Sequence, residues 1–228
     1  MKVSAIIVAA GSSHRMGFDK LEADLAGESV LARSMMAFEA TPSVFEFRVV
    51  TSPDKFEAIT ATADRLGLNK FVETLEGGAE RHLSVHAGLS RVSREADLVA
   101  VHDGARPLVT PEAISNCASV AGETGAAALA HRVADTLKLG NDQGEVAGAV
   151  SRDHLWGMQT PQIFELELLH EAYQAVFERG DLVTDEVSAL EAIGHPVKLV
   201  ENPEPNLKIT VPSDLVVAEA VFSSRRGD

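Results

Sequence analysis

A short loop near the start of the chain combines glycine with two basic side chains, a composition suited to phosphate. Gly11 follows an apolar run, and Arg15 and Lys20 lie a few positions further on. After the first strand of an open α/β sheet, such a loop directs backbone N–H groups toward phosphate oxygens. Its glycine spacing matches neither the P-loop nor the dinucleotide-binding pattern. The loop predicts a nucleoside triphosphate site, or else a plain strand-to-helix connection with solvated charges.

Asp103 and Arg106 follow a second apolar segment and combine a carboxylate with a guanidinium on one turn. A carboxylate at the carboxyl edge of the sheet suits Mg2+, which proteins often hold with one or two acidic groups plus substrate phosphates. The guanidinium suits paired hydrogen bonds to a phosphate. The alternative is a turn-forming Asp103 before Gly104, with no ligand.

Two adjacent glycines, Gly77 and Gly78, precede a helical segment that contains Arg81 and Ser84. Because glycine has no side chain, a flat base could approach the backbone here, with the Ser84 hydroxyl one turn into the helix. The same residues equally suit an ordinary strand-to-helix turn with a solvated Arg81. Further along, Thr184 is interpreted first as a helix cap.

These residues need a scaffold, and the chain alternates between apolar, β-branched runs and helical segments. Strands are predicted at residues 3–8, 47–51, 69–73, 97–101, 126–130, 196–201 and 207–210, and helices at 30–39, 53–66, 80–91, 111–121, 166–178, 185–193 and 214–222. The helices at 30, 111 and 214 follow the capping residues Ser29, Thr110 and Ser213. The alternation predicts one α/β domain over residues 1–228, a Rossmann-like, mostly parallel twisted sheet with helices on both faces.

Residues 133–155 interrupt this alternation. Two strand-like pieces, 135–139 and 146–151, flank the turn-forming stretch 140–144. Asn, Asp and Gly at its centre are typical of a hairpin turn. The polar composition of this segment, with few apolar residues, predicts an arm that projects from the sheet. Exposed strand edges of this kind need a partner to cover them.

Composition excludes several classes of protein. The net charge of −14, from 34 acidic and 20 basic residues, argues against binding nucleic acid or anionic membrane through overall charge. No apolar run approaches the ~20 residues that span a bilayer, and residues 1–11 are interpreted as a first core strand rather than a secretion signal. The sole cysteine, Cys117, is expected to be buried in a reducing compartment, which favours a cytoplasmic protein.

Short motifs lie in a fixed order along almost the whole chain. They are Ala9-Ala10-Gly11, Arg15-Met16-Gly17 with Lys20, Glu76-Gly77-Gly78-Ala79-Glu80-Arg81, Ser84-Val85, Val101-His102-Asp103-Gly104-Ala105-Arg106-Pro107, Gln159-Thr160-Pro161-Gln162, Thr184-Asp185-Glu186 and Asn206-Leu207-Lys208-Ile209-Thr210. In these motifs the chain resembles the sugar-phosphate nucleotidyltransferases, and among them the 2-C-methyl-D-erythritol 4-phosphate cytidylyltransferase family. Asp19 departs from that pattern, where the family more often has proline.

The resemblance implies that CTP and a sugar-alcohol phosphate are the substrates, with Mg2+ as cofactor and Asp103 as its ligand. It implies catalytic roles for Arg15, Lys20 and Lys208. It also implies CTP contacts at Ala9, Ala10, Gly11, Ser12, Ser13, Gly78, Ala79, Arg81, Ser84 and Gly104, and acceptor contacts at Asp103, Arg106, Thr136, Arg152, Thr160 and Thr184. Thr136 and Arg152 would reach from the arm into a second subunit's site, so a homodimer would complete the active site.

The implied reaction needs no general base. A phosphate monoester has a second pKa near ~6, so at neutral pH it is already largely a dianionic nucleophile. Catalysis would then consist of positioning and charge neutralisation. Two other functions fit the same residues: a ribitol-5-phosphate cytidylyltransferase, and a catalytically silent nucleotide-binding regulator. Arg15-Met16-Gly17 with Asp19-Lys20 also resembles the molybdopterin nucleotidyltransferases, but the motifs after Gly77 fit that family poorly.

Overall fold

The computed structural model of the chain describes residues 1–11, 18–180 and 183–226. Its main sheet contains β1 (Val3–Val8), β4 (Val44–Thr51), β5 (Phe71–Glu76), β6 (Leu98–Asp103), β7 (Ala126–Arg132), β10 (Trp156–Glu165) and β11 (Lys198–Glu201). Their order is β11-β7-β10-β6-β1-β4-β5. β10 runs antiparallel to β6 and β7, while the other neighbouring strands are parallel. The mostly parallel sheet is therefore confirmed.

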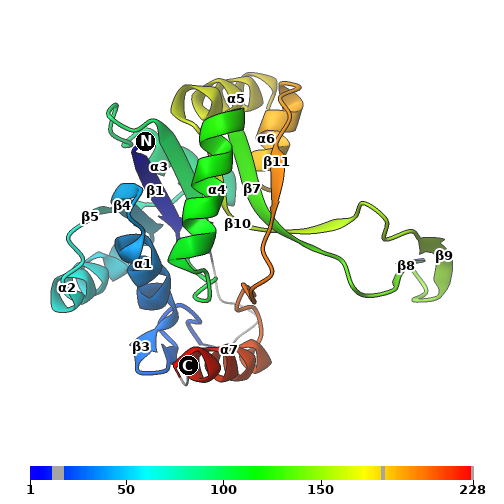
Figure 1. Cartoon of the computed structure of the whole chain (residues 1–228), viewed down its shortest axis with the longest axis horizontal. Helices are drawn as coiled ribbons and strands as arrows, with labels where there is room; N and C mark the ends of the chain where they lie inside the picture. The colour runs from blue at the N-terminus through cyan, green and yellow to red at the C-terminus, as the bar shows by residue number, and fades with distance from the viewer. Residues whose placement is uncertain (12–17, 181–182, 227–228) are drawn as a thin grey trace.

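Helices cover both faces of this sheet (Figure 1). They are α1 (Val30–Ala40), α2 (Phe56–Leu66), α3 (Arg81–Leu89), α4 (Pro111–Thr124), α5 (Leu166–Arg179), α6 (Glu186–Ala192) and α7 (Pro212–Arg226). Side chains alternate along a strand, so Ala5 and Ile7 of β1 pack into the core of α1, α2 and α4. Ile6 instead packs into the core of α3, α5 and α6. Two apolar layers thus hold the sheet between helices.

Two helix starts follow their capping signals and two do not. The hydroxyls of Ser29 and Thr110 accept hydrogen bonds from the backbone amides at the start of α1 and α4, as predicted. At α6 the cap is Asp185, whose carboxylate accepts from the Ser188 amide, rather than Thr184. Ser213 lies inside α7, which begins at Pro212. Both corrections come from runs in which neighbouring residues have cap-type side chains.

β10 is the strand that sequence patterning misses. It lies between β6 and β7 in the sheet and contains buried Gln159, Thr160 and Gln162, so it lacks an apolar alternation. The pairing with β7 is irregular between Met158 and Gln162, as expected where a proline interrupts a strand. Conversely, residues 207–210 form no strand, although the Ile209 amide donates to the Ala105 carbonyl. A small hairpin, β2 (Asp24–Leu25) with β3 (Glu28–Ser29), is also unpredicted.

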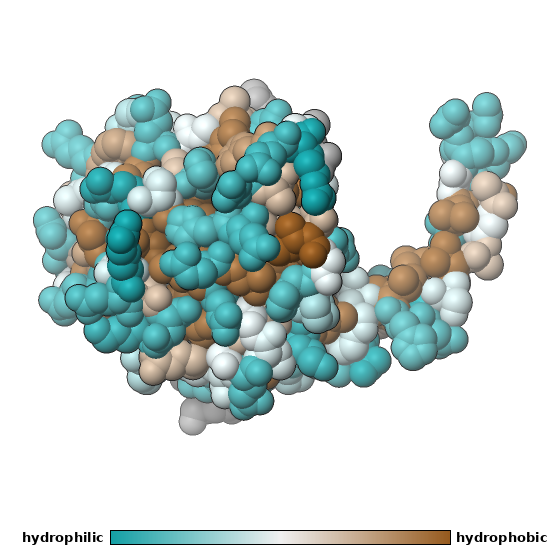
Figure 2. Space-filling view, turned by 90° about the horizontal axis from the view of Figure 1, so that it is seen from above, coloured by the Kyte–Doolittle hydropathy of each residue, from teal (hydrophilic) through white to brown (hydrophobic). Residues whose placement is uncertain are grey.

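The predicted arm is present and stands clear of the body (Figures 1 and 2). β8 (Leu137–Gly140) and β9 (Val146–Val150) pair antiparallel, and the side-chain oxygen Oδ1 of Asn141 accepts from two backbone amides of the tip turn. At the base, the Arg132 guanidinium lies over the Trp156 ring, 4.4 Å from its centroid. Leu139 and Val146 are well exposed, which leaves apolar surface on the arm.

No helix of the described residues is long and apolar enough to cross a membrane. Cys117 is fully buried in α4, as predicted, and burial raises the pKa of its thiol. The thiol is thereby held in its protonated, unreactive form.

The close packing of α3 on β1 depends on Gly88. A Cβ at this position would lie 2.6 Å from Cγ2 of Ile6, which is completely buried. Gly88→Val should therefore lower the free energy of unfolding by about 1–3 kcal/mol, measured by chemical denaturation. In the control Gly148→Ala, the new Cβ would lie an ordinary 3.8 Å from Leu139. Equal midpoints for the two variants would contradict this packing.

Candidate active site

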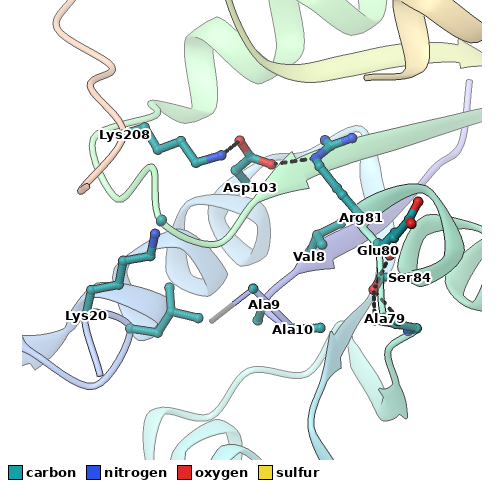
Figure 3. A pocket seen from close by; sticks show the side chains of 14 residues that line it. Val8, Ala9, Ala10, Lys20, Ala79, Glu80, Arg81, Ser84, Asp103 and Lys208 are labelled. Carbon is teal, nitrogen blue, oxygen red and sulfur yellow. Dashed lines mark hydrogen bonds and ion pairs between the residues drawn. The ribbon is translucent and has the colours of Figure 1, made fainter. Parts of the chain in front are cut away.

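A cleft of about 400 Å3 opens at the carboxyl ends of β1, β5 and β6 (Figure 3). This edge is where open parallel sheets bind ligands. The residues that line the cleft are Val8, Ala9, Ala10, Gly11, Lys20, Leu21, Gly78, Ala79, Glu80, Arg81, Ser84, Asp103, Ala105 and Lys208. The cleft thus joins residues from both ends of the phosphate loop, Gly11 and Lys20, with Gly78 and Lys208.

The double-glycine segment forms one wall and is built by close contacts. A Cβ on Gly77 would lie 2.4 Å from Cβ of Ala10, so only glycine lets these two loops meet. The Ser84 hydroxyl accepts a hydrogen bond from the Gly78 amide at 3.1 Å. Ser84 therefore shapes the loop from within, and Gly78 and Ala79 line the cleft.

Lys20 points into the cleft from the far side of the phosphate loop (Figure 3). The preceding Asp19 fixes this position: its carboxylate accepts from the Leu21 amide at 3.0 Å and forms an ion pair with Lys55. Asp19, which stands where the family more often has proline, therefore anchors the end of the loop to the turn before α2. The predicted contacts Arg15, Ser12 and Ser13 lie outside the described residues.

Asp103 gathers basic side chains from separate segments. Oδ2 of its carboxylate is 2.8 Å from Nζ of Lys208, and Oδ1 is 3.1 Å from Nε of Arg81. Nε of Arg106 lies 3.8 Å from Oδ2. Burial opposes ionisation of Asp103, but Arg81 and Lys208 outweigh it and lower the pKa of the carboxyl well below its usual range. Figure 3 shows Arg81 and Lys208 approaching Asp103 from opposite sides.

Arg81 is shared with a second carboxylate behind the cleft. Its Nη1 lies 2.6 Å from Oε1 of Glu186, which is completely buried at the start of α6. Burial disfavours a charged guanidinium, but Glu186 and Asp103 more than offset this and raise the pKa of Arg81 above its ordinary value. Arg81 is thus a permanently charged group on the wall of the cleft.

Lys208 does not lie in a strand, and its segment is held instead by the buried side-chain amide of Asn206. Nδ2 of Asn206 donates to the Thr160 carbonyl at 2.9 Å and to the Gln159 side chain at 3.2 Å. The Arg106 guanidinium donates to the Asn206 carbonyl at 2.8 Å and is largely buried beneath Asp103. Arg106 therefore supports this segment and is absent from the lining of the cleft.

A relay of buried hydrogen bonds fixes the backbone of Asp103. The Asp103 amide donates to the Thr160 hydroxyl at 3.0 Å, and that hydroxyl lies 3.0 Å from Nδ1 of His102. Nε2 of His102 is 3.2 Å from the Arg106 carbonyl, which can only accept. His102 must therefore donate through Nε2 and accept the Thr160 proton at Nδ1. Burial lowers the pKa of His102 to about 3, so the ring is neutral.

Several predicted contacts do not line this cleft. Gly104 lies beneath it, with its amide on the Val8 carbonyl, and Thr160 is buried in the relay. Thr184 lies in a neighbouring groove of about 640 Å3 between α6, β11 and the base of the arm. Thr136 and Arg152 are exposed on the arm. Neither residue is among those that line the cleft.

Sequence reasoning assigned no role to Glu186, His102 or Glu80. Glu80 lines the cleft, and the other two lie directly behind it. Both buried residues belong to recognised motifs, but only burial distinguishes them from solvated neighbours. No local pattern in the sequence indicates that burial.

Comparison with known proteins identifies close relatives. The family model described as 2-C-methyl-D-erythritol 4-phosphate cytidylyltransferase matches residues 3–224. A protein of that name from Alkaliphilus oremlandii is 40% identical over 228 residues, which cover 99% of this chain and 97% of the relative. Another, from Caldanaerobacter subterraneus subsp. tengcongensis, is 42% identical over 222 residues, covering 96% and 98%.

Solved structures agree with these sequence matches. The 4-diphosphocytidyl-2C-methyl-D-erythritol synthase of Anaerococcus prevotii superposes with a TM-score of 0.85 at 27% identity, covering 97% of this chain and 96% of the other. The 2-C-methyl-D-erythritol 4-phosphate cytidylyltransferase of Thermus thermophilus gives 0.80 at 33% identity, covering 98% and 100%. The likeness extends over nearly the whole chain.

The neutral His102 makes stability depend on pH. The folded protein keeps the ring neutral down to about pH 3, whereas the unfolded chain takes up a proton below about pH 6.5, so stability is lost as pH falls through this window. His102→Gln should flatten this dependence, measured by urea unfolding from pH 7 down to about pH 4. His170→Gln, an exposed histidine on α5, is the control and should keep the wild-type slope. An unchanged slope in His102→Gln would contradict the relay.

Proposed function

The chain belongs to the 2-C-methyl-D-erythritol 4-phosphate cytidylyltransferase family, and we propose that it transfers the cytidylyl group of CTP to 2-C-methyl-D-erythritol 4-phosphate with release of pyrophosphate. The observation that carries this proposal is the single cleft that Lys20, Lys208 and the double-glycine wall share. Such a cavity suits one nucleotide and one further anion held side by side.

CTP occupies the side of the cleft formed by the two glycine-containing loops. The backbone of Gly78 and Ala79 faces the cytosine, because Gly77 and Ser84 hold that segment open to a flat ring. The triphosphate lies along Ala9, Ala10 and Gly11, and the Lys20 ammonium group neutralises part of its charge. Backbone amides and a fixed ammonium group are the usual donors to phosphate oxygens.

The acceptor phosphate lies near Lys208 and Asp103. Its dianion attacks the α-phosphorus of CTP, forming a new P–O bond, while the bond to the bridging oxygen breaks and its electron pair leaves with pyrophosphate. No proton has to be removed from the nucleophile, so no general base is required. Lys20, Lys208 and Arg81 lower the barrier by neutralising charge on the phosphoryl oxygens and by holding the two anions together.

Asp103 fits poorly as a ligand of Mg2+. Both of its oxygens contact cations, Arg81 and Lys208. No group of three His, Cys, Asp or Glu side chains converges as metal ligands within residues 1–11, 18–180 and 183–226. A divalent ion brought with CTP would thus be held by phosphate oxygens, where it would offset negative charge. The proposed roles of the side chains do not depend on it.

The arm supports a homodimer in which each subunit completes the other's site. Leu139 and Val146 are exposed on the arm, and Leu199 is exposed in the groove beside α6. Apolar surface of this kind is stabilised when a partner covers it. A second copy of the chain would bring Thr136 and Arg152 to the groove that contains Thr184, next to the cleft. Nη1 of Arg152 donates to the Ala134 carbonyl, so the guanidinium lies against the arm and keeps its other N–H groups for a ligand.

A pyrophosphate-release assay tests the reaction. With CTP and Mg2+, the protein should release pyrophosphate with 2-C-methyl-D-erythritol 4-phosphate and not with ribitol 5-phosphate, because the family acts on the former. Lys20→Met should lower kcat by roughly 100-fold or more, while Lys2→Met, at the opposite end of β1, should not change it. Turnover only with ribitol 5-phosphate would show that this compound, and not 2-C-methyl-D-erythritol 4-phosphate, is the acceptor. CTP binding without turnover on either acceptor would indicate a regulator instead.

Mixing two inactive variants tests the shared site. Lys20→Ala and Arg152→Ala should each lose most activity as homodimers. In a mixed dimer one site carries both changes and the other carries none, so refolding the two together should restore about a quarter of wild-type activity. Refolding each variant alone is the control. A mixture no more active than its parents would show that Arg152 does not serve the partner's site.

A further inference from the structure

Glu186 is a buried carboxylate directly behind the cleft, and it is held from several sides. Its Oε1 accepts from Nη1 of Arg81 at 2.6 Å and from the Tyr173 hydroxyl at 3.1 Å. Its backbone amide donates to the Gln162 side chain at 3.1 Å. Burial and the neighbouring carboxylate raise the pKa of Tyr173 well above its ordinary value, so the phenol remains a donor. Glu186 is therefore a rigid anchor.

Arg81 is the group that this anchor holds. Nε of Arg81 contacts Asp103 while Nη1 contacts Glu186, so the guanidinium is stretched between a cleft-lining carboxylate and a buried one. The two contacts fix both the position and the plane of the guanidinium, because its donors form a rigid fork. Without Glu186, Arg81 would keep a single carboxylate partner among the contacts described here.

The contacts also balance charge. Around Asp103 and Glu186 lie the cations Arg81, Arg106 and Lys208, so the cluster holds three positive and two negative groups. Oε2 of Glu186 is buried and has no hydrogen-bond partner among the described residues. Burying a carboxylate with an unsatisfied oxygen costs desolvation free energy. The attraction between that carboxylate and the Arg81 guanidinium offsets this cost. The negative charge of Glu186 therefore acts on Arg81.

We propose that Glu186 is a positioning residue for the transfer reaction: it holds the Arg81 guanidinium against the wall of the cleft and tempers its charge. Arg81 then keeps its ion pair with Asp103, which also binds Lys208, and the affinity of the site for pyrophosphate stays low. Interactions that bind substrate or product as tightly as the transition state do not accelerate the reaction. This inference rests on the proposed function for its kinetic consequence but not for its effect on anion binding.

The near-isosteric change Glu186→Gln removes the charge and keeps the shape. It should lower kcat roughly 10- to 100-fold through displacement of Arg81. It should also tighten the Kd of inorganic pyrophosphate about threefold to tenfold, because Arg81 loses a compensating charge. Turnover and calorimetric titration with pyrophosphate measure the two effects. Damage to the fold alone would lower kcat and also weaken pyrophosphate binding. The control Glu171→Gln changes an exposed residue of α5 and should alter neither kcat nor the Kd of pyrophosphate.

A double-mutant cycle identifies the residue through which Glu186 acts. Glu186→Gln is compared in the wild-type and Arg81→Met backgrounds, or in Arg81→Gln if the methionine variant does not fold. In the Arg81-substituted background its effects on kcat and on Kd should shrink below about twofold, since the partner is gone. Equal effects in both backgrounds, or weaker pyrophosphate binding in Glu186→Gln, would overturn the proposal. If wild-type protein releases no pyrophosphate, the proposed function fails, and the cycle is decided by the Kd values alone.

Discussion

The carboxylate of Asp103 is the interaction on which the cleft depends. It lies at the end of β6 and draws Arg81 from α3 and Lys208 from the segment before α7 to one point. Its backbone amide donates directly to the Thr160 hydroxyl, which the neutral His102 orients. Because its pKa is held well below the ordinary value, this carboxylate stays charged at neutral and mildly acidic pH. A chain of net charge −14 thereby maintains a local site for anions.

The sequence predicts the parts of this arrangement that depend on short-range patterns. The run over residues 3–8 forms β1 with the same bounds, because a strand covered on both faces is apolar throughout. Ser29 and Thr110 start their helices because a capping hydroxyl acts on amides only a few residues away. Gly78 and Lys20 reach the cleft because loops after parallel strands meet at one edge.

What the sequence does not reveal depends on contacts between distant segments. β10 carries Gln159 and Gln162 in its centre, and these residues are buried because Asn202, Asn206, Asp185 and the start of α6 supply their hydrogen bonds. No periodicity marks such a strand as buried. Residues 207–210 have a strand-like composition, yet side-chain anchors rather than a ladder hold them. The burial of Glu186 likewise exists only when α3, α5 and β10 have assembled around it.

The same long-range assembly explains how an acceptor and a donor can share one small cavity. The positive groups of the cleft are partly compensated by Asp103, and Arg81 by Glu186 as well, so the ligand-free site does not hold several bare cations against one another. An incoming phosphate has to compete with these carboxylates, which limits its ground-state affinity. Charge that develops between the two reacting phosphates meets cations that are already in position, and such prearranged charges lower a barrier without reorganisation. Compensation and catalysis are therefore consequences of one network, and the carboxylates matter to the chemistry although no step requires them to accept a proton.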